Sequence, residues 1–86
     1  NMLREYFERN FNKASYEMID GGKLFYGEIR GLSGVWATGK TLEECRRNLA
    51  EVLDGWMILR LKKNLPLPGS RVLSRKPVSV SSKVYA

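Results

Sequence analysis

Histidine is absent from the 86 residues, and cysteine occurs once, as Cys45. Histidine is the usual general base near neutral pH and the commonest metal ligand, so its absence removes the main component of catalytic triads and of most zinc sites. One cysteine excludes a disulfide within the chain and a metal cage built from several cysteines. We therefore expect a protein without a cofactor, a metal ion or a catalytic reaction.

Long apolar runs are also missing. No stretch approaches the roughly 18 to 20 apolar residues that cross a bilayer, and the first residues lack the order of charges and apolar residues of a signal peptide. We therefore expect a soluble, cytoplasmic protein that does not bind membranes. The length, with 43% hydrophobic and 28% charged residues, suits one globular domain.

Charge is distributed unevenly along the chain. The formal net charge is +6, and residues 65–86 contain Arg71, Arg75, Lys76 and Lys83 but no Asp or Glu. A basic tail suits nucleic acid or an acidic partner surface, and it is also compatible with a role in solubility alone. These four residues are therefore the candidate contacts for nucleic acid.

A short amphipathic helix is predicted over residues 2–11. Leu3, Phe7 and Phe11 lie four residues apart, with Tyr6 beside them. A helix of this length is marginal alone in water. We therefore expect its aromatic stripe to pack on the rest of the domain or on another subunit.

Three short strands are predicted at residues 15–19, 24–29 and 35–38. Asp20-Gly21, between the first two, is typical of a hairpin turn because both residues tolerate positive φ. Gly31 and Gly34 mark a loop before the third strand. Strands in series imply an antiparallel meander.

A long helix is predicted to begin at Thr41. Thr41-Leu42-Glu43-Glu44 is a capping-box pattern, in which the threonine oxygen accepts from the amide of Glu44 and the glutamate reaches back. Asn64 and Pro66 predict the end of the helix. Cys45 and Trp56 are predicted to be core residues on an apolar face formed by Leu42, Cys45, Leu49, Val52, Leu53, Trp56 and Leu59.

The predicted fold is α+β, a two-layer sandwich in which the long helix covers one face of a three-stranded sheet, with an extra N-terminal helix. We expect the domain to occupy residues 1–68 and a basic, Ser/Val-rich tail to occupy residues 69–86. The alternation of Val78 and Val80 is compatible with an added strand or with a disordered tail. Because such a sheet has unpaired edges, we expect a dimer or tetramer.

A series of short motifs follows one another along the chain: Tyr16, Asp20-Gly21, Tyr26-Gly27-Glu28-Ile29, Gly31-Leu32-Ser33-Gly34, Gly39-Lys40-Thr41-Leu42-Glu43-Glu44, Asn48-Leu49 and Glu51. Their order resembles the HicB family of antitoxins from toxin–antitoxin systems, over about residues 16–68. The resemblance implies a partial ribonuclease-H-like β-β-β-α fold and a non-catalytic module that binds and masks a small HicA-type mRNA interferase.

The sequence departs from the HicB pattern in several places. Arg30 stands where that family usually has proline, and Cys45 and Val52 stand where alanine is common. The residues after Pro68 are too few for the family's usual DNA-binding domain, so we expect the core domain only. Two alternatives remain open: nucleic-acid binding by the basic tail, and a stand-alone HicB-like protein with no toxin partner.

Two catalytic or ligand-binding interpretations are disfavoured on physical grounds. Residues 34–41 match the phosphate-loop pattern Gly-x-x-x-x-Gly-Lys-Thr, but Val35-Trp36-Ala37 is bulky and typical of a strand. Metal-dependent nuclease chemistry needs clustered carboxylates, whereas the acidic residues suit a turn, a helix start or a polar helix face. The acidic residues considered are Asp20, Glu28, Glu43, Glu44, Glu51 and Asp54.

The predicted contact surface runs from the second strand through the loop into the third strand. Its residues are expected to be exposed by strand alternation or by their place in a loop, where binding residues gather. They would contact a partner protein or a second subunit. The set is Tyr26, Glu28, Arg30, Leu32 and Trp36.

Overall fold

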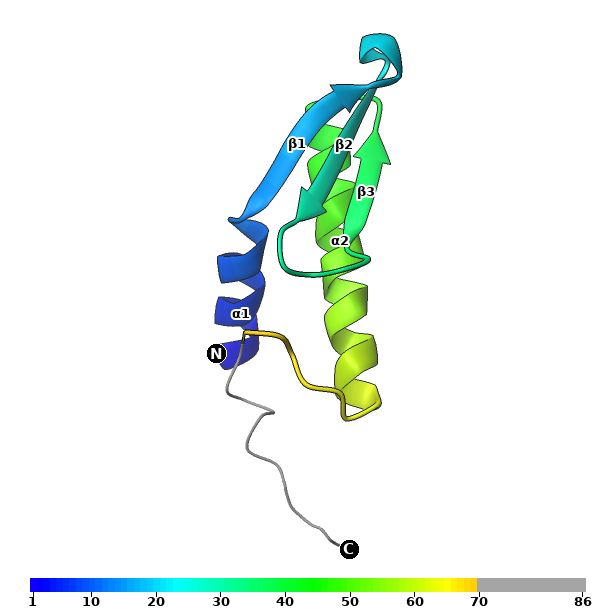
Figure 1. Ribbon diagram of the computed structural model, residues 1–86. Coiled ribbons are helices and arrows are strands. Elements are labelled where there is room, and N and C mark those ends of the chain that lie inside the picture. The colour runs from blue at the N-terminus through cyan, green and yellow to red at the C-terminus, as the bar shows by residue number, and fades with distance from the viewer. Residues whose placement is uncertain (70–86) are drawn as a thin grey trace, which may run out of the picture. The chain divides into compact units, whose positions relative to one another are not determined.

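The computed structural model describes residues 1–69 (Figure 1). Residues 1–56 form one compact unit, and the residues from 57 onward belong to a second. The predicted α+β class and order of elements are confirmed. The elements are α1 (Met2–Phe11), β1 (Ala14–Ile19), the short 3-10 helix η1 (Asp20–Gly22), β2 (Leu24–Ile29), β3 (Trp36–Gly39) and α2 (Leu42–Lys62).

Helix α1 has the predicted bounds but a different buried face. The side-chain oxygen of Asn1 caps it by accepting from the amides of Leu3 and Arg4 at 2.8 and 3.1 Å. Tyr6 and Asn10 are the buried residues, whereas Leu3 is exposed. The polar side chain of Asn10 can be buried because its Nδ2 donates a hydrogen bond to the carbonyl oxygen of Tyr6 at 2.9 Å.

The three strands form an antiparallel meander in the order β1-β2-β3, as predicted. The first hairpin turns through η1, where Asp20, Gly21 and Gly22 all have positive φ. Glycine adopts such angles at little cost, and aspartate tolerates them better than most residues. The hairpin predicted from Asp20-Gly21 is thus confirmed, although the connection also includes Gly22 and Lys23.

The loop between β2 and β3 folds its apolar residues inward. The amide of Leu32 donates to the carbonyl of Ile29, and the amide of Val35 donates to the carbonyl of Leu32, both at 3.2 Å. Ile29, Leu32 and Val35 are consequently buried. Val35, predicted to begin the third strand, lies in this loop instead, and β3 begins at Trp36.

Helix α2 packs against one face of the sheet (Figure 1). Two buried glycines allow the close approach: a Cβ at Gly39 would meet backbone atoms of Cys45, and a Cβ at Gly27 would meet the Tyr16 ring and lie 3.2 Å from Cys45 Sγ. The side-chain amide of Asn48 also donates to the carbonyl of Thr38 at 2.9 Å, which ties α2 to β3. The position of the helix on the sheet is therefore well defined.

The apolar face predicted for α2 is confirmed at its centre and wrong at its ends. Cys45, Leu49 and Leu53 are fully buried. Leu42 and Leu59 are exposed, and Trp56 is only half-buried, so it is not the core residue that was predicted. A continuous stripe of apolar residues shows which way a helix faces, but not how far along it the stripe is covered.

Arg46 joins three elements of the first unit. Its guanidinium carbon lies 5.2 Å from the ring centroid of Phe11, the last residue of α1, and 6.0 Å from that of Tyr16 in β1. Both distances fall in the range of cation–π contacts. This contact holds the end of α1 near the sheet, and no pattern in the sequence indicates it.

In the second unit, α2 ends as its sequence predicts. Asn64 adopts a positive φ of 57°. The amide of Leu65 donates to the carbonyl of Arg60 at 2.8 Å, and the amide of Asn64 donates to the carbonyl of Leu61 at 3.2 Å. This pair of bonds is the Schellman arrangement that satisfies the last carbonyls of a helix. Arg60 Nε also donates to the carbonyl of Pro66 at 2.8 Å. The turn after the helix is therefore well ordered by hydrogen bonds.

Candidate functional site

The face of the sheet opposite α2 is the candidate site, and we call it the open face. Cross-strand partners share a face, so the register places Ser15, Glu28 and Trp36 in one row. Glu17, Tyr26 and Thr38 form the neighbouring row. In the first unit, no helix of the described part of the chain covers this face (Figure 1).

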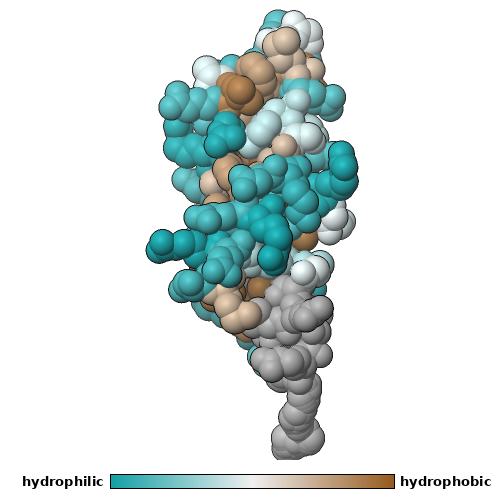
Figure 2. Space-filling view, turned by 90° about the vertical axis from the view of Figure 1, so that its left-hand side faces the viewer, coloured by the Kyte–Doolittle hydropathy of each residue, from teal (hydrophilic) through white to brown (hydrophobic). Residues whose placement is uncertain are grey.

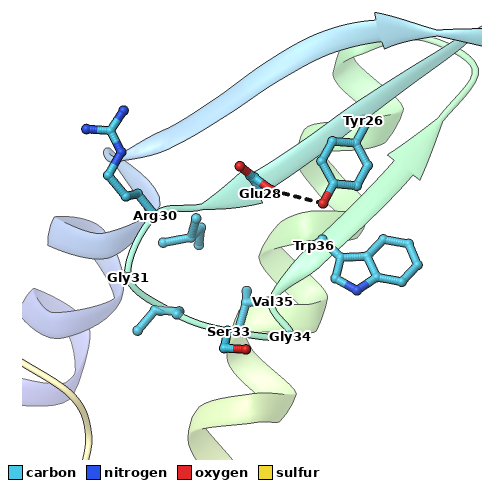
Figure 3. A pocket seen from close by; sticks show the side chains of 10 residues that line it. Tyr26, Glu28, Arg30, Gly31, Ser33, Gly34, Val35 and Trp36 are labelled. Carbon is cyan, nitrogen blue, oxygen red and sulfur yellow. Dashed lines mark hydrogen bonds between the residues drawn. The ribbon is translucent and has the colours of Figure 1, made fainter.

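An aromatic pair lies on the open face, with one ring from β2 and one from β3. The rings of Tyr26 and Trp36 stack, with centroids 6.0 Å apart and planes inclined by 26°. The Tyr26 hydroxyl donates to Glu28 Oε1 at 3.0 Å, which fixes the phenol beside the carboxylate (Figure 3). Trp36 nevertheless remains 52% exposed, a large apolar surface left in water.

The electrostatic environment of the open face is acidic. The pKa of Tyr26 is raised above its usual value, first by the hydrogen bond to Glu28, then by burial and by the negative charges of Glu28 and Glu17. Neither row of the face contains a lysine or an arginine. Glu28 is paired with Trp36 and Glu17 with Tyr26, and an aromatic pair flanked by carboxylates favours a cationic partner group.

The open face is hollowed on both sides of Tyr26 and Glu28. The larger hollow, of about 550 Å³, is bounded by these two residues, Trp36 and the loop of residues 30–35. A smaller one is lined by Ser15, Tyr16, Glu17 and the same two residues. Tyr26 and Glu28 therefore form a ridge between two recesses, a shape that suits a partner's side chains.

Of the five predicted contact residues, four reach the surface and one does not. Glu28, Arg30 and Trp36 are exposed, and Tyr26 is half-buried. The prediction that Leu32 is exposed is wrong, because its side chain is only 5% exposed within the folded loop. Arg30 comes directly after β2, and Figure 3 shows its side chain pointing away from Trp36.

The sequence and fold of the chain match known proteins. A model of the UPF0150-like family matches residues 5–68. The chain belongs to the UPF0150-like family. A crystal structure of TTHA0281 from Thermus thermophilus is similar to it, with a TM-score of 0.75 and 41% sequence identity over 84% of this chain and 96% of that one. No curated protein matches the chain.

The phosphate-loop interpretation does not fit this UPF0150-like fold. Trp36–Gly39 is a β-strand paired with β2, so the residues that would wrap a phosphate form part of the sheet. The amides at the start of α2 are also engaged: that of Lys40 donates to Glu44 Oε1 at 2.7 Å, and that of Glu44 to Thr41 Oγ1 at 3.0 Å. A phosphate there would have to displace a carboxylate.

The acidic side chains of the UPF0150-like domain are dispersed. Across residues 1–69, no group of three or more His, Cys, Asp or Glu side chains could hold a metal ion. In the same range, no helix has the length and apolar character needed to span a membrane.

Cys45 is a fully buried residue of α2, as predicted. Its Sγ lies 3.6 Å from the carbonyl oxygen of Ala37 in β3. Burial raises the pKa of the thiol above its usual value. Because the thiolate is the reactive form, this environment keeps Cys45 unreactive.

Two further parts of the surface complete the comparison with the sequence. Met18, for which the sequence predicts no role, is 64% exposed near the end of β1, and Figure 2 shows hydrophobic side chains gathered toward that upper end of the molecule.

The predicted nucleic-acid contacts lie outside the described residues, as does the predicted late strand. These contacts are Arg71, Arg75, Lys76 and Lys83.

Proposed function

We propose that this UPF0150-like chain is a non-catalytic, HicB-like protein-binding module that masks a small HicA-type mRNA interferase. The observation that carries the proposal is the exposed Trp36–Tyr26 stack beside Glu28, on a face that no helix of the first unit covers. Aromatic residues next to recesses dominate the energetics of protein interfaces. In this hypothesis the module acts by steric exclusion, and no residue performs chemistry.

The electrostatics of the open face support a basic protein as the partner. An enzyme that binds mRNA carries basic residues for the phosphates. Glu17 and Glu28 present the opposite charge, and Trp36 offers a ring for an arginine or lysine. A module bound through this face would cover the same basic residues that the interferase uses for RNA.

We further propose self-association through the free edges of the sheet. β1 and β3 are the two edge strands, and each pairs on one side only within the described residues. Unpaired backbone groups along such edges favour addition of a strand from another chain. Trp36 belongs to β3, so it lies beside one of these edges as well as on the open face.

The proposal is tested by a pull-down from the native cell lysate with the full chain as bait, at low and high salt and with nuclease treatment. We expect capture of a small basic protein that survives high salt and cleaves mRNA once purified. Trp36→Ala bait should lose it. Leu42→Ala bait, which removes an exposed apolar side chain from the start of α2, should retain it.

Two results would contradict the proposal. Capture of nucleic acid alone, released by salt, would favour binding by the basic tail, because phosphate contacts weaken steeply with ionic strength. Equal capture by the Trp36→Ala and Leu42→Ala baits would show that the open face is not the binding surface.

A further inference from the structure

The larger hollow of the open face brings together an exposed ring, a carboxylate and apolar surface. Its volume is about 550 Å³, a size typical of sites that hold a small molecule. Trp36 lines it and is 52% exposed, and Glu28, the cross-strand partner of Trp36, places a carboxylate beside the ring. Apolar surface in the same hollow comes from Ile29, Leu32 and Val35.

The carboxylate of Glu28 has hydrogen-bonding capacity to spare. Its Oε1 accepts from the Tyr26 hydroxyl at 3.0 Å, which holds the carboxylate next to the Tyr26–Trp36 stack (Figure 3). An ionised carboxylate has about four acceptor sites, so both of its oxygens can accept further hydrogen bonds. Arg30 also lines the hollow, but its side chain points away from Trp36. Glu28 is therefore the charge presented beside the exposed ring.

We propose that the larger hollow binds one arginine side chain of a partner protein. The guanidinium lies flat on Trp36 and donates to both carboxylate oxygens of Glu28, while the apolar stem of the arginine packs on the loop before β3. Guanidinium is the matching group because it is planar, stacks on aromatic rings and donates to a carboxylate as a fork. A lysine ammonium is a compact, strongly hydrated point charge, so it uses only part of this arrangement.

This inference rests on the proposed role of the open face as a binding surface, but it requires no particular partner. A protein that binds mRNA uses basic side chains to contact the phosphates. An arginine held in the hollow cannot contact a phosphate at the same time. If the partner is an mRNA interferase, the hollow would therefore remove one of its RNA contacts directly.

The test titrates blocked tripeptides into the full chain, with arginine, lysine or citrulline between two glycines. Citrulline has the shape of arginine but carries a neutral urea group, so it separates the effect of charge from that of shape. Binding is followed by the indole N–H signal of Trp36 in the NMR spectrum. A Trp56→Phe chain, in which Trp36 is the remaining tryptophan, assigns that signal.

We expect the arginine peptide to bind about tenfold more tightly than the citrulline peptide and about threefold more tightly than the lysine peptide. Glu28→Gln should reduce the preference for arginine over citrulline to about twofold or less, because the amide keeps the shape of the side chain and loses its charge. The matched control is Glu51→Gln, which removes the same charge from an exposed position of α2 and should keep the full preference.

Self-association through Trp36 does not disturb this comparison, because the result is a ratio of affinities. A second copy on the open face competes equally with every peptide, so it weakens all of them and leaves the ratio unchanged. Repeating the titration at a lower protein concentration should therefore give stronger binding with the same preference for arginine.

Three outcomes would overturn the inference. Equal responses to the arginine and citrulline peptides, or none to either, would show that the hollow does not recognise a cation. Lysine binding as tightly as arginine would refute the guanidinium fork, and a preference that Glu28→Gln leaves intact would place the cation elsewhere. Each outcome is independent of whether a toxin is captured from the lysate, so the inference and the proposed function can fail separately.

Discussion

Single residues set the distance between helix α2 and the sheet. Gly39 and Gly27 are buried where α2 crosses β3 and β2, and the side chain of Cys45 fills the space between. The close contact with the helix explains why these two residues are small. Backbone conformation does not explain it, since neither glycine has a positive φ. The sequence alone could not distinguish them from turn glycines, because that role depends on which element packs above them.

We predict that Gly39→Ala destabilises the fold. The added Cβ would fall against the backbone nitrogen of Cys45 and 2.8 Å from its Cα, so the helix or the strand must shift. Overpacking of this kind costs about 1–3 kcal/mol, which urea unfolding would measure.

The matched control is Gly55→Ala on α2, where an added Cβ meets nothing within 4 Å. It should stabilise the protein by about 0.5–1 kcal/mol, since alanine is the better helix former. A Gly39→Ala chain as stable as the unaltered one would show that α2 does not pack on the sheet as described.

Cys45 should make the stability fall in alkaline solution. Burial raises the pKa of its thiol above the usual value of 9.0, so the folded protein keeps a proton that the unfolded chain has released. The free energy of unfolding therefore declines as pH rises above about 9. In Cys45→Ala the decline should begin only above about 10, where Tyr16 and Tyr26 start to contribute, since burial raises the pKa of Tyr16 and the hydrogen bond to Glu28 raises that of Tyr26.

Denaturation at a series of pH values checks this prediction. The quantity compared is the slope with pH, because Cys45→Ala also loses packing contacts and lowers stability at every pH. Identical slopes in the two chains would contradict the assignment of the alkaline decline to Cys45.

At the scale of elements, local signals predicted starts and ends better than buried faces. The capping residues of α2, the left-handed Asn64 and the hairpin at Asp20 were all predicted, since each depends on short-range backbone hydrogen bonds or φ preferences. The buried face of α1 was not, because the spacing of apolar residues does not predict a buried asparagine, and Asn10 is buried together with Tyr6. Leu32 was misplaced because its loop folds inward.

The start of α2 gives a prediction at this scale. Thr41 Oγ1 accepts from the amide of Glu44 at 3.0 Å, and removal of an N-cap side chain costs about 1 kcal/mol. Thr41→Ala should lower the free energy of unfolding by that amount, measured by thermal or urea denaturation. The control is Ser33→Ala, in the exposed part of the loop before β3, which should have little effect on stability. A loss of stability in Ser33→Ala but not in Thr41→Ala would contradict the role of Thr41 as the N-cap of α2.

The strands also show why half of the candidate site was predictable. Strand alternation places Tyr26 and Glu28 on one face of β2, because side chains in a strand alternate strictly. That Trp36 shares this face depends on the pairing of β2 with β3. That Ser15 and Glu17 join them across β1 depends on the register of the hairpin, which only the structure supplies. The acidic character of the open face was therefore invisible in the sequence.

At the scale of the whole molecule, the sheet has two free edges and one open face within the described residues. We predict that the protein forms a dimer or tetramer, which light scattering with size-exclusion chromatography measures. Trp36→Ala should raise the dissociation constant about tenfold or more, as expected for an interface residue that contributes over about 1.4 kcal/mol. Its circular dichroism should be unchanged, and an unaltered oligomer would place the interface elsewhere.

The central claim is that the open face masks a small mRNA interferase, and an RNA-cleavage titration tests it most directly. The captured basic protein cleaves a labelled mRNA while increasing amounts of the unaltered chain, the Trp36→Ala variant or the Leu42→Ala variant are added. We expect the unaltered chain and Leu42→Ala to abolish cleavage at a stoichiometric ratio, and Trp36→Ala to require a large excess. Cleavage that continues undiminished in the presence of excess unaltered chain would contradict the account.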